Sequence, residues 1–175
     1  MKPLELCPWA AASLAAPRAV KYVEAASCDT PAAALRVIRE AAEELLLADF
    51  DASKAITFCI FPNFALDDFE AFNDFVIDIE EGVIELGSAD FDFDEDEVTV
   101  AGFHPNFRFG GEEEAAGINF EKRSPLPTVS LVRTKGIEGE KMEELTAKIG
   151  AQNEKTLAEL GDGRVAELFR EATRG

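Results

Sequence analysis

The single histidine of this chain stands among residues that suit the construction of a site. His104 lies in residues 103–111 (FHPNFRFGG), after an apolar run that predicts a buried strand and before a Gly-Gly turn. Imidazole titrates near neutral pH, which suits proton transfer, and Pro105 fixes the backbone direction beside it. We therefore predict that His104 is a catalytic acid or base. A ligand-binding histidine and a core histidine bonded to the backbone are the alternatives.

Arginines near this histidine are candidates for binding an anionic small molecule. Arg123 and Arg133 are the strongest, because a guanidinium group can grip carboxylate or phosphate with two parallel hydrogen bonds. In an acidic chain, two arginines near His104 would form a local positive pocket. The alternative is that they pair with surplus acids such as those at 112–114. Further candidates for the same ligand site are Arg108, Asn119 and Ser124.

Cys7 is a candidate nucleophile with His104 as its base. The pKa of a reactive thiol is lowered by a histidine, an arginine or a helix N-terminus, and residues 7–8 precede a possible short helix. The alternative is a small buried side chain. Cys28 and Cys59 are interpreted as structural, since Cys59 lies in the most apolar predicted strand and Cys28 precedes a helix cap.

The sequence predicts no metal and no cofactor. Aspartates at alternate positions in 90–96 imitate half of a calcium-binding loop, but Glu95 occupies the place of its glycine and Ala101 that of its final glutamate. A solvated acidic edge is the preferred interpretation. The three cysteines and His104 lack the ligand spacing of a zinc site. No dinucleotide fingerprint, phosphate-binding loop, serine-hydrolase elbow or metalloprotease motif is present.

Charge excludes some classes of partner. The 17 basic and 35 acidic residues give a net charge of −18, which disfavours nucleic acid and anionic membrane. No apolar run approaches the ~20 residues needed to span a bilayer. Three sparse cysteines favour a reducing compartment, either the cytoplasm or an organelle stroma or matrix.

The apolar periodicity predicts one α+β domain over residues 1–175. Strands are expected at 19–26, 55–61, 97–103 and 128–133. Helices are expected at 31–47, 67–86 and 164–172, with another at 138–160 that breaks near Gly150 and a short one between Pro8 and Pro17. Residues 104–127 are expected to form loops. A ferredoxin-like two-layer sandwich with a mixed or antiparallel sheet fits this order best, and a small three-layer α/β sheet is the alternative.

Four segments together resemble an uncharacterised bacterial and plastid-associated family, catalogued as domain of unknown function 1415. They are the opening LCPW (6–9), FHPNFRFGG (103–111), Asn119 with RSPLP (123–127), and NEKTLAELG (153–161). The resemblance covers residues 4–161 and implies a fold and a site, but no reaction. Ser130 stands where the family often has a histidine, which disfavours a two-histidine metal site, and the acidic run at 90–97 resembles an insertion.

Three functions follow as hypotheses. The first is a small-molecule enzyme of hydrolase or transferase type, in which His104 moves protons, Arg123 anchors an anionic group and Cys7 is a possible nucleophile. The second is a non-catalytic binding or assembly protein that uses the FHPNFRFGG and RSPLP loops. The third is a thiol redox sensor centred on Cys7.

Overall fold

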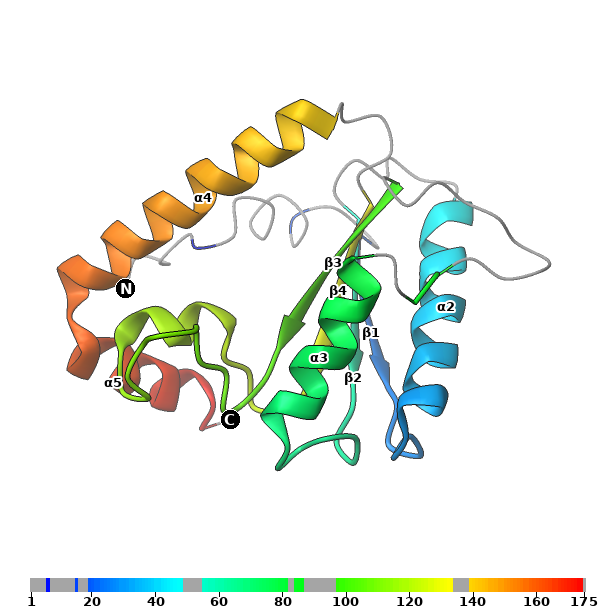
Figure 1. The fold of residues 1–175 in the computed structure, drawn as a ribbon, viewed down its shortest axis with the longest axis horizontal. Coiled ribbons are helices and arrows are strands. Elements are labelled where there is room, and N and C mark those ends of the chain that lie inside the picture. Colours follow the sequence, from blue (N-terminus) through cyan, green and yellow to red (C-terminus); the bar gives the residue numbers. More distant parts are fainter. Residues whose placement is uncertain are drawn as a thin grey trace.

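The computed structural model describes residues 6, 15, 19–48, 55–81, 84–86, 97–133 and 139–174. Its centre is a four-stranded sheet in the order β1-β2-β4-β3 (Figure 1). β1 is parallel to β2, whereas β4 is antiparallel to both β2 and β3. The strands are β1 (Val20–Glu24), β2 (Ile56–Ile60), β3 (Val98–Phe103) and β4 (Thr128–Arg133).

Two capped helices cover one face of this sheet. α2 (Pro31–Leu47) begins after Thr30, whose side chain accepts a hydrogen bond from the Ala33 N–H, and Pro31 occupies the first turn, where its missing N–H costs nothing. α3 (Phe69–Glu80) begins after Asp68, whose carboxylate accepts from the Ala71 N–H at 3.0 Å. Their apolar sides pack on the sheet and form the core with Cys59, Phe61, Val129 and Leu131.

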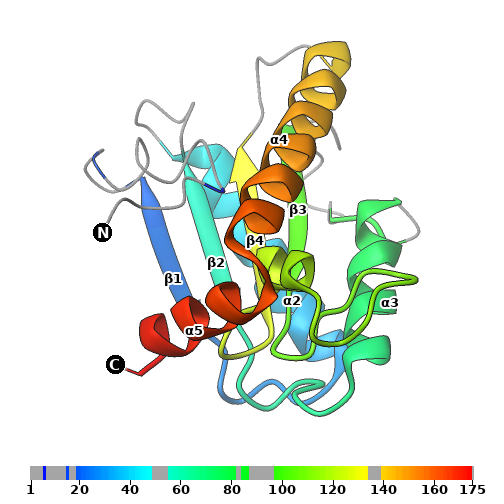
Figure 2. The same cartoon turned by 90° about the vertical axis from the view of Figure 1, so that its left-hand side faces the viewer.

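The remaining helices pack together on the opposite side of the strands from α2 (Figures 1 and 2). They are the 3₁₀ helix η3 (Gly117–Lys122), α4 (Gly139–Leu160) and α5 (Asp162–Ala172). η3 contacts both α4 and α5, and the Phe120 ring meets the Phe169 ring edge to face. Among the described residues, no helix has the length and apolar character needed to cross a membrane.

The predicted α+β class with a mixed sheet is confirmed. The four strands and α2 lie where the periodicity placed them. Because α3 is inserted between β2 and β3, the element order differs from the β-α-β-β-α-β order of a ferredoxin-like chain. The likeness therefore lies in the packing of helices on a sheet, and the connectivity is different. The short helix predicted between Pro8 and Pro17 and the acidic run at 90–96 lie outside the described residues, apart from Ala15.

Several helical features differ from the prediction. α3 ends at Glu80 and not near residue 86, and the Ile84 N–H bonds to the Asp78 carbonyl just beyond it. Ile84 and Leu86 still pack on the core, so the apolar pattern outlasts the helix. α4 continues through Gly150, which is exposed, because a long helix tolerates the ~1 kcal/mol cost of one glycine. The 104–127 segment contains η3, which was not predicted.

Gly102 on β3 provides a test of the sheet–helix contact. A Cβ at this position would lie 3.1 Å from both methyl groups of Val76 and 3.3 Å from the Phe72 ring. We expect Gly102→Ala to lower the free energy of unfolding by about 1–3 kcal/mol, because α3 must shift to make room. Gly110→Ala is the control, since nothing lies within 4 Å of its Cβ. Urea unfolding measures both, and equal stabilities would contradict this packing.

Candidate functional site

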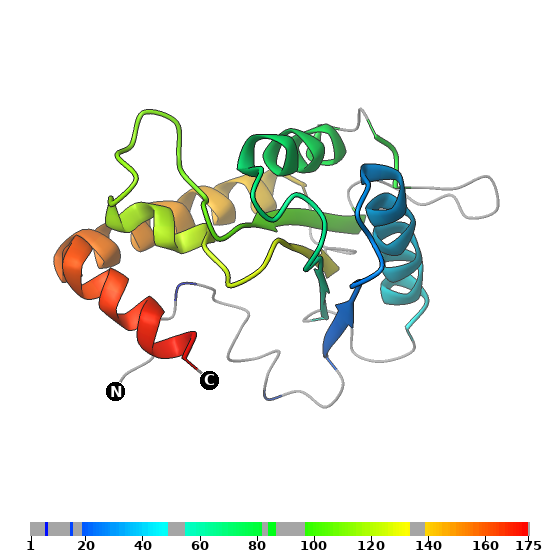
Figure 3. The same ribbon diagram turned by 90° about the horizontal axis from the view of Figure 1, so that it is seen from below.

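The predicted site residues, apart from Arg133 and Cys7, gather at one end of the sheet. β2 and β3 run in the same direction because both are antiparallel to β4, so their C-terminal ends lie beside the start of β4. The FHPNFRFGG segment leaves β3 there, and the RSPLP segment enters β4. The Phe61 N–H bonds to the Pro127 carbonyl at 2.8 Å, which joins the end of β2 to the same place. Figure 3 shows η3 between the loop of residues 104–116 and helices α4 and α5.

His104 is fully buried at this end of the sheet. Its Nδ1 atom lies 3.1 Å from the Asn106 backbone nitrogen, whose hydrogen it accepts. The ring hydrogen of the neutral imidazole is therefore on Nε2, which donates to the Ala65 carbonyl at 2.9 Å. The rings of Phe69 and Phe72 lie 5.5 and 5.3 Å from it, centroid to centroid. Both nitrogens are thus occupied by backbone groups in an aromatic setting.

Burial lowers the pKa of His104 below its ordinary value of 6.5. Desolvation disfavours the imidazolium form, and it outweighs the opposing effects of the Ala65 hydrogen bond and of the Asp67 and Asp68 carboxylates. The ring is therefore neutral at pH 7, which agrees with its role as both a donor and an acceptor.

Asn119 on η3 is also fully buried and binds the loop that follows His104. Its Oδ1 atom accepts the Phe109 N–H at 2.9 Å. Its Nδ2 atom donates to the carbonyls of Glu113 and Glu114, at 2.8 and 3.3 Å. One buried carboxamide therefore bonds backbone groups on both sides of the Gly110-Gly111 turn, and its own donor and acceptor atoms are thereby paired.

Arg123 holds the same loop from its other side. Its Nε donates to the Phe107 carbonyl at 3.2 Å, and its Nη2 donates to the Glu114 carbonyl at 2.8 Å. The guanidinium carbon lies 4.5 Å from the centroid of the Phe120 ring. Burial lowers the pKa of Arg123, and the Glu114 carboxylate opposes this. The side chain remains half-buried, so part of the cation still faces the surface.

Two further cations lie close to Phe107. The Lys122 ammonium is 5.6 Å from the centroid of the Phe107 ring, and the Lys122 carbonyl accepts the His104 N–H at 3.1 Å. Arg108 follows Phe107 and is exposed. Within the described residues, its side chain makes no hydrogen bond or ion pair. We call Arg108, Lys122 and Arg123 the cationic surface.

Other predicted residues have different surroundings. Arg133 lies at the far end of β4, about 17 Å from Thr128 along the strand. Its Nη1 donates to the Leu45 and Ala48 carbonyls at the end of α2, so it is separated from His104. The Ser124 hydroxyl donates to the Leu126 carbonyl at 2.5 Å and shapes the turn before β4. Cys7 lies outside the described residues.

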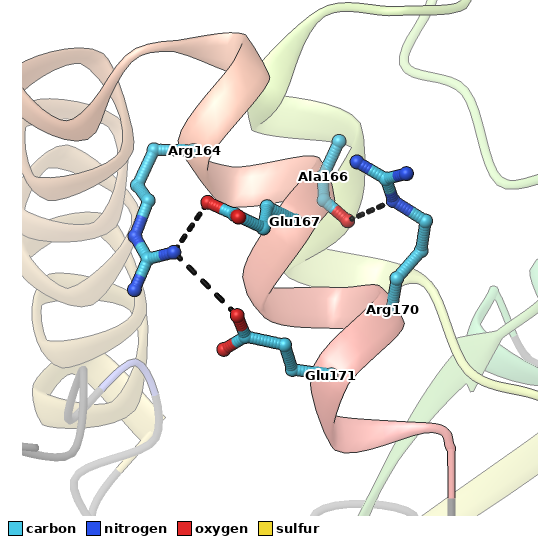
Figure 4. Close-up of polar contacts among 5 residues, drawn as sticks. All are labelled: Arg164, Ala166, Glu167, Arg170 and Glu171. Carbon is cyan, nitrogen blue, oxygen red and sulfur yellow. Dashed lines mark hydrogen bonds and ion pairs between the residues drawn. The ribbon is translucent and has the colours of Figure 1, made fainter.

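The arginines of α5 are engaged on their own helix (Figure 4). Arg164 forms ion pairs with Glu167 and, at 3.7 Å, with Glu171. The Arg170 Nε donates to the Ala166 carbonyl at 3.2 Å. These contacts direct both guanidinium groups along α5, so we do not include them in the cationic surface.

Two polar anchors of this region had little signal in the sequence. Asn153 on α4 is buried and donates to the Leu6 carbonyl at 2.9 Å and to the Glu121 carboxylate at 2.8 Å. It therefore joins the first, third and fourth of the motif segments, and its place at the start of NEKTLAELG was the available signal. Asp162 accepts the Gly117 N–H at 2.7 Å, where a Cβ on Gly117 would lie 2.9 Å from the carboxylate oxygen.

The described cysteines and acids do not resemble a reactive or metal centre. Burial raises the pKa of Cys59 to about 12, despite the opposing effect of Lys21, so this thiol stays protonated. Cys28 is buried as well. Across the part of the chain that the structure describes, no three histidine, cysteine, aspartate or glutamate side chains gather as metal ligands.

Together these features define an α+β protein in which buried polar side chains fix the loops at one end of a mixed sheet. The chain belongs to the family described as "Protein of unknown function (DUF1415)", whose sequence profile matches residues 2–167. No curated protein and no solved structure matches the chain. Membership confirms the family indicated by the four motif segments and assigns no activity.

Loss of the Asn119 carboxamide should loosen the loop of residues 104–116. We expect Asn119→Ala to lower the free energy of unfolding by about 2–3 kcal/mol, because it removes the partners of the Phe109 N–H and the Glu113 carbonyl. Asn106→Ala is the control, since its side chain is exposed. Urea unfolding and limited proteolysis measure the effect. Losses of less than about 0.5 kcal/mol in both variants would rule out the anchor.

The His104 imidazole should make stability depend on pH. Its folded-state pKa lies below the 6.5 of an unperturbed histidine, so the unfolded chain binds more protons between these two values. The contribution of the neutral imidazole to the free energy of unfolding is complete above about pH 6.5, and it is lost progressively as the pH falls toward the folded-state pKa. Urea unfolding across this range should show the loss in the wild type and not in His104→Asn. The same pH slope in both proteins would contradict it.

Proposed function

We propose that this protein is a non-catalytic binding protein that recognises an anionic group, carboxylate or phosphate, at the cationic surface. One observation carries the proposal: the polar side chains at this end of the sheet form hydrogen bonds with loop backbone. His104, Asn119 and Arg123 all bond to loop backbone. They support a loop from which Arg108 projects exposed, and a preordered loop loses little entropy when it binds a partner.

The geometry supports binding more than proton transfer. An acid or base must come within hydrogen-bond reach of the substrate. Both nitrogens of His104 are bonded to backbone, and its ring is sealed from solvent. A catalytic role for His104 or Cys7 and a redox role for Cys7 stay predictions from the sequence.

Local charge distinguishes this surface within an acidic chain. Lys122 and Arg123 each have an aromatic ring beside the cation, and Arg108 adds a third positive charge next to Phe107. Glu114 is the acid that acts on Arg123, and its backbone carbonyl is held by the same guanidinium. Lys122 likewise acts on the Glu80 carboxylate, so acids accompany two of these cations, whereas the exposed Arg108 makes no ion pair in the described part of the chain.

Trimetaphosphate is a suitable probe because it is a compact anion that keeps its charge from acidic to neutral pH. We expect it to shift the amide NMR signals of residues 107–109 and 122–123. We also expect Arg108→Ala to weaken binding about fivefold, a loss of ~1 kcal/mol. Arg36→Ala is the matched control, since Arg36 is an exposed arginine on α2. Absence of binding, or an equal loss in both variants, would refute the proposal.

A further inference from the structure

The imidazole of His104 joins two loops that no strand pairing holds together. Its Nε2 atom bonds to the Ala65 carbonyl in the loop between β2 and α3. Its Nδ1 atom accepts the Asn106 N–H in the loop after β3. The ring therefore joins its own loop to Ala65, which lies 39 residues before His104, and its geometry depends on one nitrogen bearing hydrogen and the other not.

The Ala65 side of this bridge is strained. Ala65 has a φ of +52°, and among the described residues it is the one non-glycine with positive φ. A side chain disfavours this left-handed conformation, so neighbouring contacts must hold it. The Ala65 carbonyl accepts both the Asp68 N–H at 3.1 Å and the His104 Nε2 hydrogen. Since Asp68 also caps α3, the start of that helix is tied to the imidazole.

Protonation would break the other side of the bridge. An imidazolium carries hydrogen on both nitrogens, so Nδ1 would present a donor to the Asn106 N–H, which is also a donor. The two cannot bond, and one must move. Asn106 is exposed and Pro105 is half-buried, so this turn can move outward without disturbing the sheet.

Burial and nearby charges act on the ring in opposite directions. The Asp67 and Asp68 carboxylates favour the imidazolium from the loop before α3. On η3, Lys122 lies over the Phe107 ring, and the Lys122 carbonyl accepts the His104 N–H. α3 contributes the uncharged rings of Phe69 and Phe72. Protonation of His104 is therefore opposed by burial and favoured by the two carboxylates.

We propose that His104 is a proton-operated latch, closed when neutral, whose protonation releases the 105–106 turn while Nε2 stays bonded to the Ala65 carbonyl, and thereby disorders the cationic surface. The consequence for ligand binding rests on the proposed function, whereas the latch itself does not. The Phe107 N–H bonds to the His104 carbonyl, and Phe107 contacts both Lys122 and Arg123. Movement of the turn is thus transmitted directly to residues that position the cations.

The single histidine allows a direct test in the whole protein. Proton NMR of the imidazole and amide spectra would be recorded from about pH 8 down to pH 4.5, which spans histidine titration. We expect the amide signals of Ala65, Asn106 and Phe107 to change with the midpoint of the His104 ring, while those of β1 and α5 stay in place. We also expect trimetaphosphate affinity to fall at least fivefold below that midpoint.

Variants separate the ring from nearby carboxylates. His104→Asn and His104→Gln cannot titrate, so the shared midpoint should vanish in both. Asn at 104 can keep the bond from the Asn106 N–H, whereas Gln reaches toward Ala65. Asp68→Asn keeps a good helix cap and removes one carboxylate that favours the imidazolium, so the midpoint should move to lower pH. This variant keeps the test informative if the His104 variants fail to fold.

The outcomes are distinguishable. A ring that titrates only when the whole chain unfolds, or Ala65 and Asn106 signals that ignore its midpoint, would overturn the latch and leave the proposed function standing. If the signals of the loop residues follow the His104 midpoint but the trimetaphosphate affinity stays the same, the claim that His104 controls the cationic surface would be overturned. No trimetaphosphate binding even at neutral pH would refute the proposed function, and the amide signals would still decide the latch.

Discussion

Polar side chains buried at the loop end of the sheet must find hydrogen-bond partners, and the rest of this site depends on their finding them in loop backbone. A buried N–H or carbonyl without a partner costs about 1–3 kcal/mol. Strand pairing ends at Phe103 and begins again at Thr128, so the intervening segment cannot use a ladder. Side chains supply the partners instead: Asn119 for residues 109 and 113–114, Arg123 for residues 107 and 114, and His104 for residues 65 and 106.

This use of side chains explains why residues that could take part in catalysis or binding are concentrated here. Imidazole, carboxamide and guanidinium are the groups that can serve several backbone partners from one position. The features that suggest catalysis in the sequence are therefore also those that a buried irregular loop requires. Exposure separates the two uses. His104 and Asn119 are sealed in the interior, whereas Arg108 points to solvent from the loop they support.

The fold was largely predictable from the sequence, while the hydrogen-bond partners of the site residues were not. The pattern of apolar residues predicts a buried strand at 55–61 and an amphipathic helix at 31–47, and both lie as expected. α3 was predicted too long because Ile84 and Leu86 continue the apolar pattern after the helix has ended. The position of His104 beyond β3 was foreseen, but its partner Ala65 was not, because a contact across 39 residues leaves no local signal. Arg133 shows the same difficulty, since only the direction of β4 places it far from His104.

Holding loops by side chains has a physical consequence that strand pairing lacks. A backbone ladder is indifferent to pH, because amides do not titrate in the physiological range. An imidazole with one donor and one acceptor nitrogen works in a single protonation state, and burial sets the pH at which that state is lost. Asn119 makes equivalent bonds without titrating, and Arg123 retains its charge, so of these three anchors His104 alone responds to protons. The bond from Nε2 to the Ala65 carbonyl survives protonation, whereas the bond from the Asn106 N–H to Nδ1 does not, so loss of the neutral state favours release of the 105–106 turn.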